Sequence, residues 1–207
     1  MSLSIVSSPF MSRNYLLIYR GLCATFLAYT IVAGALVQMP APYVMYLTNW
    51  MVMLNFCYFT SAALALALPK MGFIRKAAYH LNEICLPNAM TGPIGYIYFR
   101  VITDHGGTLL LLLFDFFISR TVFPIKHVYW PSIVFLYIPV SAIYTLIYNE
   151  IYPGLTFRDV TSLGFVVFAV TTTLLSFVVL VYFIPRYKSD KTESASEILV
   201  HKTDSAC

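Results

Sequence analysis

Six apolar stretches, each close to the length that a helix needs to cross a bilayer, constrain the fold of this chain most. A spanning helix takes about 20 consecutive apolar residues. The 207 residues are 59% hydrophobic and only 11% charged, with a mean hydropathy of +0.77, whereas soluble domains carry about 25% charged residues. We therefore expect an all-α, polytopic integral membrane protein. The six expected transmembrane helices are Leu16–Val37, Leu47–Leu68, Ala77–Phe99, Gly106–Phe123, Tyr129–Ile147 and Thr161–Ile184.

The third expected span is more polar than the other five. It contains His80, Glu83, Pro87 and Asn88, and such a helix is tolerated where it lies inside protein or lines a cavity. The alternative is a re-entrant or surface segment.

Basic residues predict the orientation of the spans. With a cytosolic N-terminus, the outer loops hold only Arg100 and Arg158, and the other loop and tail Lys and Arg residues are cytosolic. This positive-inside pattern favours cytosolic N- and C-termini. We expect tails at 1–14 and 189–207 around a membrane domain at 15–188. Because the basic residues are scattered, they do not predict a nucleic-acid partner. Spans of this length do not distinguish the plasma membrane from the endoplasmic reticulum or other endomembranes.

Asp115 is expected near the middle of the fourth span, about 15 Å below His105 along the helix axis. A carboxylate at that depth costs about 2.5–3.5 kcal/mol on insertion scales, so it requires a partner or a function. We expect a tyrosine of the fifth span, such as Tyr144, to be that partner. A structural hydrogen bond and a role in a site remain alternatives.

Thr48 and His105 begin the second and fourth expected spans from the outer side of the membrane. A hydroxyl becomes a nucleophile when a neighbouring imidazole accepts its proton. Asn49 and Asn55 are candidate donors to an oxyanion. The alternative is structural: Thr48 caps its helix and His105 lies in an interfacial loop.

His80 and Glu83 have the i, i+3 spacing found at metal sites in helical bundles. A single pair of this kind is a weak signal, and His127 and His201 are expected in other regions of the protein. No nucleotide-binding loop or serine-hydrolase motif occurs in the sequence. We therefore expect neither a metal nor a cofactor.

Short motifs at the starts of three spans resemble the rolling-stone family. They are Tyr19-Arg20, Tyr46-Leu47-Thr48-Asn49-Trp50, and Asp104-His105-Gly106 before the leucine-rich helix with Asp115. The same layout, over about residues 15–185, is similar to the androgen-induced family of six-span lipid hydrolases.

The second resemblance implies an intramembrane hydrolase of fatty-acid esters of hydroxy fatty acids. It implies a threonine nucleophile at Thr48 and a histidine base at His105, with membrane lipids and a lipid ester as partners. The rolling-stone resemblance implies instead a non-catalytic membrane protein in cell adhesion, fusion or complex assembly, with membrane protein partners that the sequence does not identify.

Overall fold

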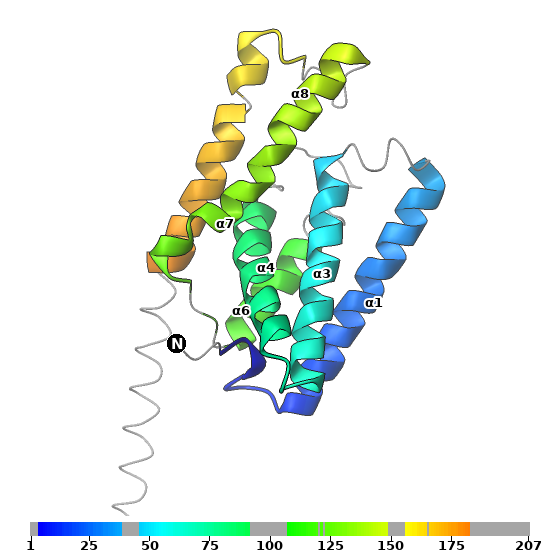
Figure 1. Cartoon of the computed structure of the whole chain (residues 1–207), viewed down its shortest axis with the longest axis vertical. Helices are drawn as coiled ribbons and strands as arrows, with labels where there is room; N and C mark the ends of the chain where they lie inside the picture. Colours follow the sequence, from blue (N-terminus) through cyan, green and yellow to red (C-terminus); the bar gives the residue numbers. More distant parts are fainter. Residues whose placement is uncertain are drawn as a thin grey trace, which may run out of the picture.

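The computed structural model describes residues 4–38, 46–91, 107–119, 121, 123–148, 156–164 and 166–182. Every regular element in these ranges is a helix (Figure 1). The elements are η1 (Ser4–Val6), α1 (Arg13–Gln38), α3 (Leu47–Ala67), α4 (Gly72–Thr91), α6 (Thr108–Ile118), η4 (Ile125–His127), α7 (Tyr129–Ser132), η5 (Ile133–Leu136) and α8 (Tyr137–Ile147). A C-terminal helix occupies Val160–Tyr182.

Within the described residues, four helices are long and apolar enough to cross a membrane, and this identifies a helical membrane protein. Their apolar stretches are Arg13–Leu36, Asn49–Ala67, Tyr129–Ile147 and Val160–Tyr182. These correspond to the first, second, fifth and sixth expected spans.

The third and fourth expected spans take shorter or more polar forms. α6 has 11 residues, about 16 Å of helix against a hydrocarbon core of about 30 Å. α4 has 20 residues but carries Arg75, Lys76 and Glu83. Both helices contribute buried side chains to the protein core.

The directions of α1, α3 and α6 follow from their contacts. Arg13, at the start of α1, donates from Nε to the carbonyl oxygen of Leu66, near the end of α3, at 3.1 Å. α1 and α3 are therefore antiparallel. Tyr58 of α3 contacts Asp115 of α6, and further along both helices Leu66 and Ile118 belong to one buried apolar cluster with Leu16 of α1. α3 and α6 therefore run in the same direction.

The core lies among α1, α3, α4 and α6, and the C-terminal helix packs against it (Figure 1). Phe59 and Phe116 are almost fully buried. The ring of Phe123 stacks on that of Phe177 in the C-terminal helix, with 6.3 Å between centroids. α8 continues from α7 and η5 beside this core (Figure 1).

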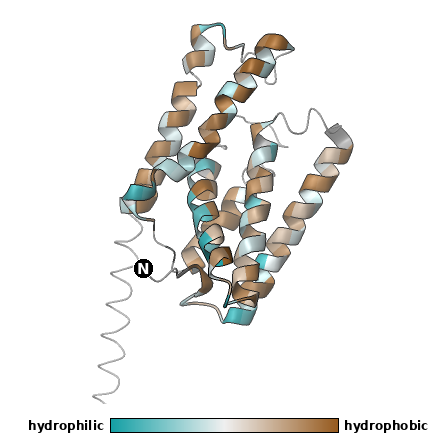
Figure 2. Cartoon of the chain, in the orientation of Figure 1, coloured by the Kyte–Doolittle hydropathy of each residue, from teal (hydrophilic) through white to brown (hydrophobic). Residues whose placement is uncertain are grey.

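The outer helices expose apolar side chains over much of their length (Figure 2). On α1 they recur every three or four residues and form one face, which suits contact with lipid. The exposed apolar side chains of this face are Ile18, Leu22, Phe26, Tyr29, Val32 and Leu36.

We expect Phe59→Ala to lower the free energy of unfolding by about 3–5 kcal/mol, because it leaves a cavity in a close-packed core. Phe59 is 0% exposed, whereas Phe26 on the outer face of α1 is 53% exposed. Phe26→Ala is therefore the matched control, with an expected loss within about 0.5 kcal/mol. Denaturant unfolding in detergent micelles measures both. Equal losses would contradict the packing described here.

Candidate functional site

Three fully buried polar side chains meet where α1, α3 and α6 come together. Arg20 of α1 donates from Nε to Oδ1 of Asp115 at 2.8 Å and from Nη2 to Oδ2 at 3.0 Å. The Tyr58 hydroxyl of α3 donates to Oδ2 of the same carboxylate. Arg20 also donates from Nη1 to the carbonyl oxygen of Ile5 at 2.8 Å. This network joins three helices and the N-terminal turn η1.

The arrangement of the Arg20–Asp115 pair offsets the cost of burying two charges. Each buried ion costs several kcal/mol, and the attraction compensates only with good geometry and further hydrogen bonds. The planar guanidinium bonds both carboxylate oxygens at once, which also fixes the relative orientation of the side chains. The network therefore sets the register of α6 against α1 and α3.

The expectation that a tyrosine of the fifth span pairs with Asp115 is wrong. The partners of Asp115 are Arg20 and Tyr58, from the first and second spans. Tyr144 lies on α8, where its ring contacts that of Tyr148 in a tilted arrangement with 5.1 Å between centroids.

The two candidate catalytic residues lie at the edge of what the structure describes. Thr48 is placed as a backbone position in the first turn of α3, and His105 lies outside the described residues. The hydrogen bond between them remains a prediction. Asn49, the next residue on α3, is half-buried and already interacts with other groups of the protein.

Asn55 is fully buried on α3. Its Nδ2 and Oδ1 have no hydrogen-bond partner within the described part of the chain, and the same holds for Asn82 on α4. A buried unsatisfied polar group costs about 1–3 kcal/mol, so such groups mark places where an ordered water or a polar ligand atom binds. Asn55 thus remains a candidate ligand-binding residue.

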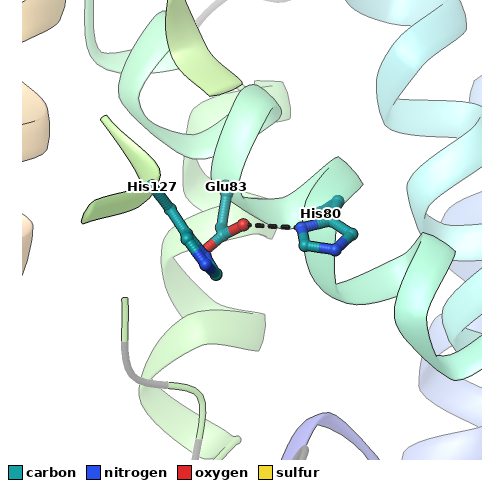
Figure 3. A group of neighbouring side chains, drawn as sticks. All are labelled: His80, Glu83 and His127. Atoms are coloured by element: carbon teal, nitrogen blue, oxygen red, sulfur yellow. Dashed lines mark hydrogen bonds and ion pairs between the residues drawn. The ribbon is translucent and has the colours of Figure 1, made fainter. Parts of the chain in front are cut away.

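A second polar cluster joins α4 to the segment that leads into α7. The two carboxylate oxygens of Glu83 accept from different imidazoles: Oε2 lies 2.9 Å from Nδ1 of His80, and Oε1 lies 2.6 Å from Nδ1 of His127. Glu83 lies between the two rings (Figure 3). Its side chain is 0% exposed, whereas those of His80 and His127 are 33% and 17% exposed.

Aromatic rings surround this cluster. Trp130 stacks on His80 with 4.5 Å between ring centroids. The ring of Tyr79 meets His80 and His127 edge-on, at 5.6 Å and 6.2 Å. Burial, followed by the charge of Lys126, lowers the pKa of His127. A lowered pKa favours the neutral imidazole, which is the form that can accept a proton or bind a metal.

Sequence reasoning missed Arg20, Tyr58 and His127 as members of polar clusters. A signal for Arg20 was present, because it is a basic residue inside an apolar span and Asp115 is an acid inside another. For His127 there was none. It is 44 residues from Glu83, in a loop segment whose course no periodicity predicts.

Comparisons with known proteins identify no relative of this chain. No family model, no curated protein and no solved structure matches it.

We expect Arg20→Met to destabilise the protein by about 3–5 kcal/mol, because it leaves the Asp115 carboxylate buried without a counter-charge. Arg20→Met combined with Asp115→Leu should recover most of this loss, since neither charge then remains. Tyr58→Phe removes one hydrogen bond to a charged group and should cost about 1.5–3 kcal/mol. A double-mutant cycle from denaturant unfolding in micelles measures the coupling. If the losses of unfolding free energy from Arg20→Met and Asp115→Leu simply add in the double variant, the two side chains do not form a stabilising ion pair.

Proposed function

We propose that this chain is an intramembrane hydrolase of fatty-acid esters of hydroxy fatty acids, with Thr48 as nucleophile and His105 as base. The register of α3 against α6 is the observation that carries the proposal. Tyr58 and Asp115, which are hydrogen-bonded, are 57 residues apart in the sequence. Thr48 and His105 are also 57 residues apart. Thr48 lies ten residues before Tyr58, and His105 lies ten residues before Asp115.

This register matters because α3 and α6 run in the same direction. Moving back along two helices that run in the same direction by equal steps of about 1.5 Å per residue keeps two positions at about one level, here as far as Thr108, where α6 begins. His105 is also only two residues from Gly107, the first described residue before α6. Two peptide units span at most about 7–8 Å, so His105 stays close to the start of that helix. These constraints support a Thr48–His105 pair near one end of the bundle.

Asn55 gives further support. It follows Thr48 by seven residues, which is two helical turns, and so lies on the same face of α3. Its side-chain amide is buried and has no partner within the described residues. A polar lipid group that entered beneath Thr48 would meet this amide.

The proposed reaction has two steps. As His105 takes the hydroxyl proton, Oγ of Thr48 attacks the ester carbonyl carbon, and the alcohol then leaves with that proton. Water, deprotonated by His105, attacks the acyl-threonine ester, and the fatty acid leaves as Thr48 regains its proton. The outward apolar faces of the helices suit lateral access for a membrane lipid.

The test is hydrolysis of a panel of fatty-acid esters of hydroxy fatty acids by the purified full chain in detergent. Thr48→Ala and His105→Ala should each lower turnover by about 100-fold or more, because each removes a group from a coupled pair. Thr48→Ser should retain partial activity, since it keeps a hydroxyl.

Matched variants control for unspecific effects. Thr25 of α1 is exposed, and its hydroxyl donates a hydrogen bond to the carbonyl oxygen of Gly21 at 3.0 Å, within its own helix. Thr25→Ala and His201→Ala should leave turnover unchanged. If no ester is hydrolysed by the folded wild-type protein, the hydrolase proposal is wrong, and a non-catalytic role in adhesion, fusion or complex assembly takes its place.

We further propose six membrane spans with both termini in the cytosol, in the plasma membrane or the endoplasmic reticulum. α4 and α6, completed by neighbouring residues, would form the third and fourth spans. A four-span arrangement, which uses only the four long apolar helices, would keep 68–128 on the cytosolic side.

Cysteine labelling distinguishes the two topologies. Single cysteines are placed at Arg100, Arg158 or Lys126 in a chain without native cysteines, and sealed microsomes with the cytosolic side outward are treated with an impermeant maleimide. Lys126→Cys should react and Arg158→Cys should be protected in both topologies. Six spans predict protection of Arg100→Cys, whereas labelling of Arg100→Cys would establish four.

A further inference from the structure

The proposed hydrolase gives no role to Glu83, whose buried carboxylate lies between two histidines. Asp115, the other fully buried acid described above, has an arginine as its counter-charge. In the described part of the chain, the ion-pair partners of Glu83 are two histidines and no lysine or arginine. A buried carboxylate that stays ionised requires a positive charge nearby. Here a protonated imidazole or a bound cation can supply it.

The three side chains are a recognised ligand set. Neutral imidazoles and a carboxylate suit Zn²⁺ and related first-row divalent ions, and two histidines with one glutamate hold zinc in several hydrolases. Ca²⁺ and Mg²⁺ prefer all-oxygen ligands and fit this set poorly.

The geometry is close to that of a metal site. One ligand atom from each of His80, Glu83 and His127 can be chosen so that all three lie within 4.8 Å of one another. Ligands about 2.0–2.2 Å from a tetrahedral ion lie about 3.3–3.5 Å apart, so the widest-spaced pair must close by about 1.5 Å. His80 is one-third exposed, which leaves its ring room to turn.

We propose that His80, Glu83 and His127 bind a single divalent transition-metal ion, with Zn²⁺ as the preferred ion. The ion replaces the imidazole protons that now face the carboxylate and supplies its counter-charge. Three protein ligands leave one tetrahedral position for a water or a substrate oxygen, as in catalytic zinc sites. Trp130 stacks on the ring of His80 and Tyr79 meets it edge-on, so both rings border the proposed site.

The site is independent of the proposed hydrolase. Its ligands come from α4 and η4, whereas Thr48 and His105 belong to other segments. Failure of the hydrolase proposal would therefore leave this one standing, and the reverse also holds.

The test uses the purified full chain in detergent, with no polyhistidine tag, after removal of metals with a chelator. Titration with Zn²⁺ against a chromophoric competitor gives the affinity, and elemental analysis gives the stoichiometry. We expect one tightly bound Zn²⁺ per chain. His80→Ala, Glu83→Gln and His127→Ala should each weaken binding by about 10–100-fold or more.

Two histidines outside the cluster provide matched controls. His105→Ala and His201→Ala should keep the wild-type affinity, and so should Thr48→Ala. Unchanged affinity in all three ligand variants, or no Zn²⁺ retained by the folded wild type, would overturn the proposal and leave only a hydrogen-bonded carboxylate between two histidines.

If the alanine variants do not fold, a variant that replaces one metal ligand by another still tests the proposal. His127→Cys offers a thiolate, which is also a good ligand for Zn²⁺ and Co²⁺. Loaded with Co²⁺, the wild type should show visible absorption of a tetrahedral site, and His127→Cys should add a thiolate-to-cobalt charge-transfer band. Absence of both signals would also overturn the proposal.

Discussion

The ion pair between Arg20 and Asp115 is the interaction on which the arrangement of the helices depends. Apolar helix surfaces pack in many registers at similar cost, because lipid and side chains are equally apolar. A buried charge does not allow that freedom, since a shift of one residue turns it by about 100° away from its partner. Arg20, Asp115 and Tyr58 therefore select one register of α1, α3 and α6.

That register has a consequence at the other end of the same helices. Because α3 and α6 run in one direction, a contact fixed at Tyr58 and Asp115 also fixes how their N-terminal ends are matched. A nucleophile and its base must be held within hydrogen-bond reach, and rigid helices do this better than loops. The buried pair thus has a structural role, and in the proposed hydrolase it would act on the site only through this register.

The sequence predicted the four long apolar helices well and the partners of polar groups poorly, for one physical reason. A long run of apolar residues indicates a segment surrounded by lipid or by other apolar side chains, so the long apolar helices could be predicted from the sequence alone. That Asp115 needed a partner followed from its burial, but Arg20, Tyr58 and Tyr144 were all chemically suitable. Only packing decides which of them comes within 3 Å of the carboxylate. The match of His127 to Glu83 depends on a turn with no periodic signal.

The two buried acids hold different parts of the molecule together by different means. Asp115 has a permanent counter-charge, because arginine stays protonated in proteins. The ion-pair partners of Glu83 in the described part of the chain are histidines, whose charge depends on protonation. The Asp115 network joins the helices of the core, whereas Glu83 ties α4 to the segment from which α7 and α8 continue. The contact between these two parts therefore combines a site whose charge can change with the uncharged hydrogen bond from Nδ2 of Asn88 to the carbonyl oxygen of Pro131, at 3.2 Å.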